Sequence, residues 1–472
     1  MEPLAVIFFA FFFISIILIF VGPIITEKYH PSLFGKQISI DYGTFPLTVV
    51  LLSYFSGIIS LEMIKNGIFG KPPLQPYTIV IFFFSFAYLC VSLDQTGIFR
   101  FVALKLINRS NGDGKRLFSI IFILSSGLTV VTSNDIVIMT LTPIVLNVIK
   151  ETKIKGLPYL IAQFFGANIW SMFLLIGNPT NIIVGIANNI DFVAYLRLMF
   201  VPTIAGGLIT YILLRMLFHK SISMSSFPSP QINPNSAFSD RTGAKIITPL
   251  FFTCIILLSI SVYIDVDMWI ISAIFAGIAF LIDFTRFIKA KVKGLTQNLI
   301  FDKCFSQSSI PTGYPELRIT IKRLPYKIFS FTLSFFIFVE GLQYYGFTTM
   351  LASFFAKFVG GPIQNALFMA ISSMIFANLM NNQPMTVLFT EVLAEPALLS
   401  SGPAYAALLY GVIIGSNLGA NITFFGALAG LMWKKMLSDQ CEFVSLKTFF
   451  QTGILTMIPA VLVIVTLLGF SL

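Results

Sequence analysis

Several separate segments of this chain are each long and apolar enough to cross a lipid bilayer as a helix. They are residues 4–26, 43–62, 77–99, 199–218, 246–264, 268–285, 328–348 and 448–470. A membrane-spanning helix needs about 20 apolar residues, and in lipid only helices or closed barrels satisfy every backbone polar group. Hydrophobic residues make up 56% of the chain and charged residues 11%, which is more apolar surface than a water-soluble core can bury. The sequence therefore predicts an all-α, polytopic protein of the cell membrane.

A large part of the net charge of +10 lies between residues 286 and 327. This segment carries Arg286, Lys289, Lys291, Lys293, Lys303, Arg318, Lys322, Arg323 and Lys327 against Asp302 and Glu316. Lysine and arginine gather in the cytoplasmic loops of membrane proteins. We therefore expect 286–327 to be a basic cytoplasmic loop, and we do not take the positive charge as a sign of nucleic-acid binding.

Cysteine and histidine are too dispersed to indicate a metal site or a disulfide framework. Cys90, Cys254, Cys304 and Cys441 contain no C-x-x-C pair, and His30 and His219 fall in predicted loops. The chain also lacks a recognisable catalytic serine motif. We therefore expect no metal, no cofactor, no catalytic residue and no enzymatic activity.

Residues 130–145, VVTSNDIVIMTLTPIV, place consecutive polar residues between two apolar arms. The arms, 117–131 and 136–149, would each form a helix of about 22 Å, which is shorter than the hydrocarbon core of about 30 Å. Basic residues flank both arms: Arg100, Lys105, Arg109, Lys115 and Arg116 before them, and Lys150, Lys153 and Lys155 after them. Because both ends are then expected on the cytoplasmic side, the segment is predicted to be a re-entrant hairpin with its tip, Thr132–Asp135, near the membrane midplane.

Residues 367–393, LFMAISSMIFANLMNNQPMTVLFTEVL, show the same pattern, with a polar tip that begins at Asn381. Glu391 and Glu395 follow this tip, and no basic residue follows it before Lys434. The charge therefore favours a second hairpin that opens toward the outer face, with both glutamates in water.

The two hairpins belong to an internal repeat with an offset of 249 residues. LDQTGIF at 93–99 aligns with LQYYGFT at 342–348, and GANIWSMFLLIG at 166–177 aligns with GSNLGANITFFG at 415–426. Each half is expected to hold about five transmembrane helices and one hairpin, giving about ten spans and two hairpins, and the odd number of spans inverts the second half in the membrane. We expect a first repeat at 1–218, a linker at 219–245 and a second repeat at 246–472.

A broken helix is predicted after each hairpin. GNPTN at 177–181 interrupts the apolar segment 157–190, and Gly415–Gly430 is the matching interruption in the second half. Proline removes a backbone donor, and unwound backbone in a membrane is tolerated only beside protein or a water-lined cavity. Inverted repeats with broken helices place the substrate site at the midplane between them. The predicted substrate- and ion-binding residues are Thr132, Ser133, Asn134, Asp135, Asn168, Gly177, Asn178, Thr180, Asn181, Asn381, Asn382, Gln383, Asn417, Asn421 and Thr423.

Three carboxylates are candidates for coupling transport to an ion. Asp135 lies at the first hairpin tip. An unpaired carboxylate inside a membrane costs free energy, so its presence there makes Asp135 a functional candidate. Asp94 and Glu340 lie within predicted spans. Each would carry a proton or bind a cation, so the coupling ion is expected to be H⁺ or Na⁺; the alternative for each is a protonated or paired structural carboxylate.

Stretches along almost the whole chain resemble those of a known transporter family. They are SLDQTGIFRFVALKL at 92–106, SNDIVIMTLTPIV at 133–145, DFVAYLRLMFVP at 191–202, MNNQPMTVL at 380–388, GSNLGANITFFGALAGLMW at 415–433 and FQTGILTMIP at 450–459. In these stretches the chain resembles the arsenite-efflux membrane pumps of the ion transporter superfamily, which includes sodium-coupled dicarboxylate transporters. The resemblance implies a scaffold domain and a transport domain that moves substrate by an elevator-like motion. It further implies a homodimer, as in the dicarboxylate transporters, and a soluble ATPase subunit if the chain acts as a true arsenite pump.

The chain departs from this family at the second broken helix. It has Asn417 where the pumps are expected to carry Asp, and Ala420-Asn421 where they are expected to carry Pro-Lys. The missing charges put proton coupling and metalloid specificity in question.

The function that these features favour is proton-coupled efflux of an arsenite- or antimonite-type hydroxide by a secondary transporter. No Lys or Arg falls in the polar clusters, so a multiply charged anion would lack a counter-ion there, and the dispersed cysteines argue against capture by thiolates. The alternative is a sodium-coupled transporter of an organic or inorganic anion, because side-chain and backbone oxygens suit a hard cation and helix N-termini suit an anion. A cation/proton antiporter that uses Asp135, and a passive channel, are further alternatives that the fold does not separate.

Overall fold

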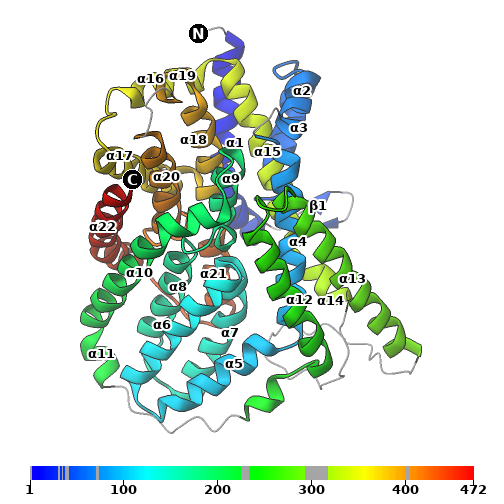
Figure 1. The fold of residues 1–472 in the computed structure, drawn as a ribbon, viewed down its shortest axis with the longest axis vertical. Coiled ribbons are helices and arrows are strands. Elements are labelled where there is room, and N and C mark those ends of the chain that lie inside the picture. The colour runs from blue at the N-terminus through cyan, green and yellow to red at the C-terminus, as the bar shows by residue number, and fades with distance from the viewer. Residues whose placement is uncertain are drawn as a thin grey trace.

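The computed structural model describes residues 3–29, 32–33, 36–37, 42–70, 74–224, 233–292, 317–399 and 404–472, which are almost entirely helical (Figure 1). Six residues that were discussed above lie outside these ranges: His30, Lys293, Asp302, Lys303, Cys304 and Glu316. The first half contains α1 (Pro3–Tyr29), β1 (Ser32–Leu33), β2 (Lys36–Gln37), α2 (Phe45–Phe55), α3 (Leu61–Phe69), α4 (Pro76–Gln95), α5 (Ile98–Ile107), η1 (Asn108–Ser110), α6 (Gly114–Val131), α7 (Asn134–Thr152), α8 (Leu157–Trp170), η2 (Leu175–Gly177), α9 (Pro179–Ala187) and α10 (Phe192–Leu217). Strands β1 and β2 pair in antiparallel fashion.

The second half repeats this order of helices. It contains α11 (His219–Ser223), η3 (Pro234–Ala237), α12 (Arg241–Ser259), α13 (Met268–Val292), α14 (Leu317–Arg323), α15 (Tyr326–Tyr344), α16 (Phe347–Ala356), α17 (Pro362–Met380), α18 (Asn382–Ala394), α19 (Pro396–Leu399), α20 (Ala404–Gly419), α21 (Leu428–Asp439) and α22 (Leu446–Ser471).

Within the described ranges, nine helical segments are long and apolar enough to cross a membrane. They are Pro3–Gly22, Pro76–Gln95, Gly114–Val131, Phe192–Leu217, Arg241–Ser259, Met268–Val292, Leu317–Tyr344, Pro362–Met380 and Leu446–Ser471. Shorter apolar helices lie at Phe45–Phe55, Phe347–Ala356 and Ala404–Gly419. These elements confirm the prediction of an all-α, polytopic membrane protein.

The prediction of one unbroken span at 43–62 is wrong. The segment forms α2 and then, after a turn, α3. Gly57 has a φ of 72°, in the left-handed region where glycine carries no steric penalty. The amide of Ile58 donates to the Ser53 carbonyl over 2.9 Å, and Ser60 caps α3 by accepting a hydrogen bond from the Met63 amide. The polar residues near the end of an apolar run therefore mark a second break, which hydropathy alone does not separate from a continuous helix.

The predicted basic loop 286–327 is helical at both of its ends. Residues 286–292 continue α13, and 317–323 form α14, which contacts α4 and α13. Of the basic residues at these ends, Arg286 pairs with Asp240 across 2.6 Å, whereas Lys289, Lys291 and Lys322 are exposed.

The element boundaries recur at the offset of 249. Adding 249 to the bounds of α5 gives 347–356, the bounds of α16, and adding it to those of α6 gives 363–380, against Pro362–Met380 for α17. The first residue of α9, moved by the same offset, is the first residue of α21. The order of elements thus follows the repeat, whereas the inversion of the second half in the membrane stays a prediction.

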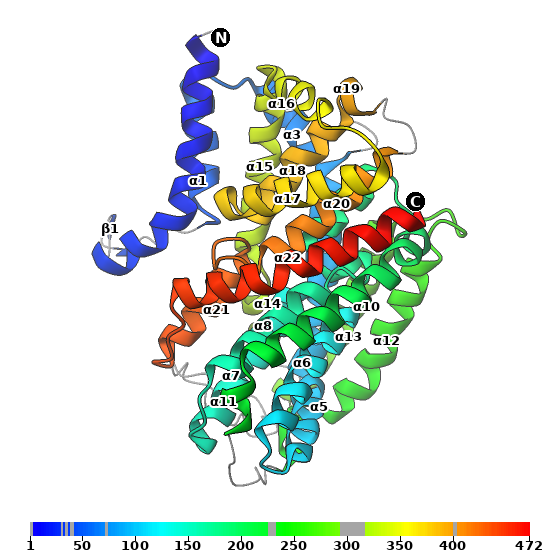
Figure 2. The same cartoon turned by 90° about the vertical axis from the view of Figure 1, so that its left-hand side faces the viewer.

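The helices pack in two groups (Figures 1 and 2). Group I comprises α1–α4 and α12–α15, where α13 packs against α4 and α12, and α15 packs against α2, α3 and α4. Group II comprises α6–α10 and α17–α22, where α17 packs against α20, α10 against α22 and α6 against α8. Group I lies mainly on the right of Figure 1 and group II mainly on the left.

Short helices connect the two groups once in each half. Helix α5 joins α4 to α6, and α16 joins α15 to α17. Each connector follows a glycine in the left-handed region, Gly97 with φ 84° and Gly346 with φ 76°. A Cβ on Gly97 would also lie 2.1 Å from the Ala237 carbonyl oxygen, so the chain requires glycine at this junction.

Candidate functional site

The first polar tip joins α6 to α7 at Thr132 and Ser133. Thr132 donates its hydroxyl hydrogen bond back to the Leu128 carbonyl over 2.7 Å, which ends α6. Asn134 then starts α7, and its Oδ1 accepts from the Asp135 amide over 2.9 Å. These local bonds turn the chain between two helices that pack against each other.

The second polar tip joins α17 to α18 at Asn381. This residue has a φ of 75°, a conformation that Asn tolerates better than most residues, and its Oδ1 caps α18 by accepting from the Gln383 amide. Its Nδ2 donates to the Phe425 carbonyl over 3.2 Å, and the Asn382 amide donates to the Gly426 carbonyl over 3.0 Å. The tip is therefore fastened to the second broken helix.

Both predicted helix breaks are present as unwound segments between α8 and α9 and between α20 and α21. Asn178 caps α9, with Pro179 in its first turn, by accepting from the Thr180 amide over 3.1 Å. A Cβ on Gly177 would lie 2.3 Å from the Ser171 carbonyl oxygen, and one on Gly426 would lie 2.5 Å from the Gly419 carbonyl oxygen. These repeat-related glycines let each unwound segment fold back on its own helix.

A cavity of about 410 Å³, here named the Asp135 cavity, lies where group I meets group II. Group II contributes Ser133 and Asp135, while Cys90 comes from α4 of group I. The remaining polar wall comes from the ends of the predicted loop, with Lys322, Arg323 and Lys327, and from Tyr42 and Tyr326. Within the described part of the chain, the Asp135 carboxylate accepts no hydrogen bond and forms no ion pair. The cavity therefore brings an acidic residue of a hairpin tip to a basic wall.

The basic wall is the part of the site that the sequence did not identify. Lys322, Arg323 and Lys327 were assigned to a solvated loop because positive charge in membrane proteins usually marks one. Lys322 and Arg323 end α14 and Lys327 lies in the first turn of α15, and nothing in the local sequence indicates that these helix ends adjoin a cavity. Arg323 also pairs with Asp94 across 2.6 Å, so this coupling candidate is the partner of an arginine.

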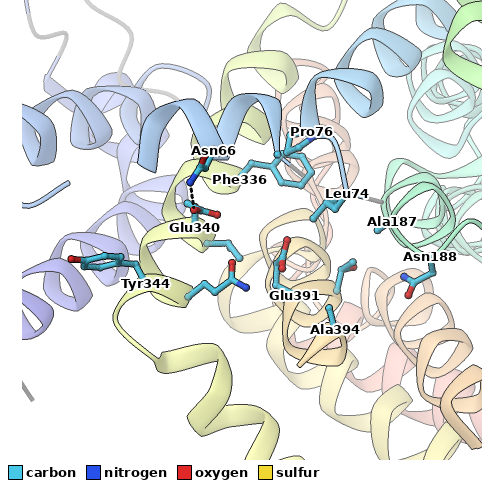
Figure 3. Close-up of a pocket in the computed structure, with 15 residues that line it drawn as sticks. Asn66, Leu74, Pro76, Ala187, Asn188, Phe336, Glu340, Tyr344, Glu391 and Ala394 are labelled. Atoms are coloured by element: carbon cyan, nitrogen blue, oxygen red, sulfur yellow. Dashed lines mark hydrogen bonds between the residues drawn. The ribbon is translucent and has the colours of Figure 1, made fainter. Parts of the chain in front are cut away.

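A second cavity of about 410 Å³, here named the Glu391 cavity, lies between α3 and α15 of group I and α9 and α18 of group II. Glu340 and Glu391 line it, and Figure 3 shows both carboxylates directed toward the same space. Glu340 accepts a hydrogen bond from Asn66 Nδ2 over 3.0 Å.

The expectation that Glu391 lies in water is wrong: its side chain is partly buried in this cavity, because α18 packs against α15. Glu395 instead accepts hydrogen bonds from Thr348 and Thr349.

The two cavities lie at opposite ends of α9: Pro179 and Ile182 line the Asp135 cavity, and Ala187 lines the Glu391 cavity. The Asp135 cavity adjoins α14, in the lower half of Figure 1, and the Glu391 cavity adjoins α3 and α18, in the upper half.

Buried amide side chains connect the two halves of the chain between these cavities. Asn417 receives hydrogen bonds at its Oδ1 from Ser171 Oγ over 2.6 Å and from Asn178 Nδ2 over 2.7 Å, and its Nδ2 donates to Asn181 Oδ1 over 2.8 Å. Asn417 and these three partners are all fully or almost fully buried. One residue of the second half thus satisfies three polar groups of the first broken helix.

A second chain of amides starts at the first hairpin tip. Asn134 Nδ2 donates to Asn168 Oδ1 over 3.0 Å, and Asn168 Nδ2 donates to Asn421 Oδ1 over 2.9 Å. At the second tip, Asn382 Nδ2 donates to the Ser416 carbonyl over 3.4 Å, and Ser416 Oγ donates to Thr180 Oγ1 over 3.0 Å. Both tips are therefore linked to both broken helices.

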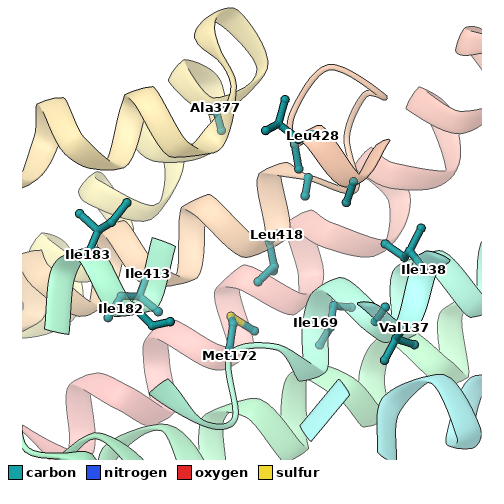
Figure 4. Packing of buried hydrophobic residues seen from close by; sticks show 14 of the residues in the cluster. Val137, Ile138, Ile169, Met172, Ile182, Ile183, Ala377, Ile413, Leu418 and Leu428 are labelled. Atoms are coloured by element: carbon teal, nitrogen blue, oxygen red, sulfur yellow. The ribbon is translucent and has the colours of Figure 1, made fainter. Parts of the chain in front are cut away.

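Apolar side chains surround this network. Figure 4 shows Val137, Ile169, Ile182, Ile413 and Leu418, all buried, packed among α7, α8, α9 and α20. Because water is excluded there, each amide needs a protein partner, and a lost partner costs about 1–3 kcal/mol.

The structure thus separates the predicted site residues into three sets. Those in the amide network are Asn134, Asn168, Asn178, Thr180, Asn181, Asn382, Asn417 and Asn421, with Gly177 in the adjoining unwound segment. Ser133 and Asp135 line the Asp135 cavity. Thr132, Asn381, Gln383 and Thr423 make bonds outside the network, to Leu128, Phe425, Thr332 and Asn378 respectively.

Comparison with known proteins gives matches over most of the chain. The family description CitMHS, Citrate transporter, matches residues 23–412. An Escherichia coli (strain K12) protein named arsenical pump membrane protein is 27% identical over 384 residues, which cover 80% of this chain and 83% of its own length. A Bacillus subtilis (strain 168) protein, provisionally named an arsenical pump membrane protein, is 27% identical over 477 residues, which cover 97% and 98%. The crystal structure of the Alcanivorax borkumensis YdaH transporter, described as having an unusual topology, shares the fold, with a TM-score of 0.52 at 16% identity over 99% of this chain and 98% of that chain.

Proposed function

This chain belongs to the CitMHS citrate transporter family and is a multi-pass secondary transporter of the cell membrane, and on this premise we propose that it exports a small neutral hydroxide of the arsenite or antimonite type in exchange for protons. The observation that carries the proposal is the buried network of uncharged amides with one carboxylate, Asp135, at its edge. Relatives that align over most of the chain are named as arsenical pumps.

The chemistry of the amide network suits a neutral, hydroxylated solute. Asparagine side chains both donate and accept hydrogen bonds, so they match the hydroxyl groups of a metalloid hydroxide without a charge partner. Asn168 already bonds to Asn421, and Asn417 already bonds to Asn181, so a solute would replace some of these bonds. Among the described residues that line the Asp135 cavity, Cys90 supplies the single thiol, which favours hydrogen bonding over capture by several thiolates.

An elevator-like movement of group II against group I would carry this solute across the membrane. Three features support it: the packing within each group, the position of both cavities where the groups meet, and the glycine-initiated connectors α5 and α16. Hinges need a few residues that absorb changes of φ and ψ, and Gly97 and Gly346 are suited to this.

Transport by purified protein in liposomes tests the proposal. Proton and sodium gradients are imposed separately, and the movement of arsenite, antimonite, citrate and phosphate is measured. We expect arsenite to move in response to the proton gradient and not the sodium gradient. A passive channel would instead conduct without dependence on either gradient, which would refute coupled transport.

The variant Asp135→Asn tests whether Asp135 couples transport to protons. Because a partly buried carboxylate without a partner in a membrane protein is costly unless it exchanges a proton or cation, we expect proton-driven arsenite transport to fall by about tenfold or more. Asp439→Asn, at the exposed end of α21, is the matched control and should transport like the unaltered protein. Full activity in Asp135→Asn, with correct folding shown by gel filtration, would remove Asp135 from the mechanism.

A second candidate function is sodium-coupled transport of an anion. The observation that favours it is the basic wall of the Asp135 cavity, since Lys322 and Lys327 supply positive charge that the polar tips lack, while Arg323 is paired with Asp94. The family description names citrate, a multiply charged anion. Citrate or phosphate movement that requires the sodium gradient, in the same liposomes, would replace the first candidate with this one.

The homodimer and the soluble ATPase subunit stay predictions. Light scattering of the protein in detergent tests the first, and co-purification with a soluble ATPase tests the second.

A further inference from the structure

The Glu391 cavity contains two carboxylates that come from opposite sides of the boundary between the helix groups. Glu340 lies on α15 of group I, and Glu391 lies on α18 of group II (Figure 3). Their positions in the repeat correspond to Val91 and Thr142 of the first half, so neither carboxylate has an acidic counterpart at the Asp135 cavity. This acidic pair is therefore specific to the Glu391 cavity.

No positive charge compensates these carboxylates within the described wall of the cavity. Among its lining residues there is no Lys, Arg or His, and the bond from Asn66 to Glu340 is neutral. The Glu391 carboxylate accepts no hydrogen bond and forms no ion pair in the described ranges.

The titratable groups that face Glu391 are also uncharged or acidic. Glu340 faces it from α15, whereas the ring of Tyr344, on the same helix, points away from it (Figure 3), and Glu395 follows directly after α18. Tyr405 of α20 lies close enough to interact with it electrostatically and donates its hydroxyl to Asn188 over 3.0 Å. The groups from α3 and α9 that line the cavity, Asn66 and Asn188, do not titrate.

We propose that Glu340 and Glu391 form a proton-binding site in the Glu391 cavity, distinct from Asp135, where the coupling proton is taken up or released. Two ionised carboxylates that face one cavity repel each other when no cation lies between them, and one proton shared between them removes the repulsion. In this state the two carboxyl groups share one proton, and Asn66 Nδ2 still donates its hydrogen bond to Glu340. This inference rests on the proton coupling proposed above.

Movement of group II would link this proton to transport. Glu391 would move with α18 while Glu340 stays on α15, so the distance between the carboxylates would change with each conformational step. Separation weakens the repulsion that favours the shared proton and so promotes its release. The site thus supplies a physical reason why proton transfer and solute movement occur together.

Comparing net transport with exchange for Glu391→Gln tests the proposal. Net arsenite movement driven by a pH gradient requires a proton to bind and leave, whereas exchange of arsenite for labelled arsenite across the same liposomes requires no net proton movement. We expect Glu391→Gln and Glu340→Gln to lower net proton-driven transport by about tenfold or more, and to reduce exchange far less. Glu391→Asp, which restores a carboxyl group, should recover part of the net transport and its pH dependence.

Glu395→Gln is the matched control, because Glu395 lies four residues further along the chain and bonds to Thr348 and Thr349 outside the cavity. It should keep both net transport and exchange. Equal loss of net transport and exchange in Glu391→Gln, or no loss of either, would overturn the proton site; so would net transport that depends on sodium at constant pH. If the unaltered protein shows no proton-driven arsenite transport, the proposed function fails instead, which distinguishes the two failures.

Discussion

The Asp135 cavity and the Glu391 cavity occupy related places in the two halves of the chain but differ in charge. In each, the third apolar helix of a repeat faces the hairpin of the same repeat: α4 and α7 around the first, α15 and α18 around the second. The repeat offset relates Ala87 to Phe336 and Cys90 to Val339 across the two walls. Basic residues of α14 and α15 line the first cavity, whereas Glu340 and Glu391 line the second.

This difference shows that the repeat determines which helices form the two cavities, whereas the charged residues that line each cavity are not repeated. Asp135 corresponds to Pro384, and Glu391 corresponds to Thr142, so each hairpin carries its carboxylate at a position that its relative leaves uncharged. Two identical cavities would give a transporter with no difference between its two faces. The different charges of the two cavities instead give the solute and the coupling ion a different environment in each cavity.

The largest effect is expected from Asn417→Ala, which breaks the network between the cavities. The change leaves Asn178 Nδ2 and Asn181 Oδ1 without their buried partner, at about 1–3 kcal/mol for each group that stays unpaired, while Ser171 Oγ keeps its bond to the Asn168 carbonyl. We expect the melting temperature in detergent to fall clearly and transport to be lost. Thermal unfolding followed by fluorescence, and arsenite transport in liposomes, measure the two effects.

Two further variants serve as comparisons for Asn417→Ala. Asn417→Asp keeps the acceptor for Ser171 and Asn178 but loses the donor to Asn181, so its stability should lie between those of Asn417→Ala and the unaltered protein. Asn235→Ala, at an exposed position in η3, should change neither quantity. Transport by Asn417→Ala at the normal rate would show that the two cavities work without the network.

Sequence reasoning located the amide network because its residues interrupt apolar segments. Asn134, Asn178 and Asn382 each lie between two apolar stretches, where a polar residue needs a specific partner. The partners themselves, such as Asn417 for Asn178, depend on how distant helices cross and could not be read from the local pattern.

The charged walls escaped prediction for the same reason. Lys322 and Glu391 have sequence surroundings typical of solvated helix ends, and their place in a cavity follows from contacts of α14 with α4 and of α15 with α18. The break between α2 and α3 was missed because Gly57 and Ser60 are compatible with both a continuous and an interrupted helix until the Ser60 cap is known.

A smaller effect is expected from neutralising the basic wall with Lys322→Gln and Lys327→Gln. If the Asp135 cavity admits anions through this wall, each change should weaken citrate or phosphate inhibition of transport by about two- to fivefold, the range for partly solvated charge interactions. Arsenite, which is neutral near pH 7, should move at nearly the same rate. Inhibition curves at low and high salt measure the effect, which salt should reduce.

Lys435→Gln, at an exposed position of α21, is the control for the loss of one positive charge. An equal effect of this change would mean that net charge and not the cavity wall is responsible. An equal loss of arsenite and anion transport in the Lys322 and Lys327 variants would instead assign these lysines to the structure of α14 and α15.

The smallest effect is expected from Cys90→Val, which gives the Asp135 cavity the residue that the repeat places at the Glu391 cavity. Cys90 is buried on α4 and behaves as a small apolar side chain, so valine should fit with little change in packing. If arsenite is held by hydrogen bonds to amides, its transport should change by no more than about twofold, because a free cysteine contributes chiefly packing at such a position. Initial rates over a range of arsenite concentrations, compared with those for antimonite, measure this. A large rise in KM for both metalloids with unchanged citrate inhibition would show that the thiol binds the solute, and would make the two cavities differ in metalloid chemistry as well as in charge.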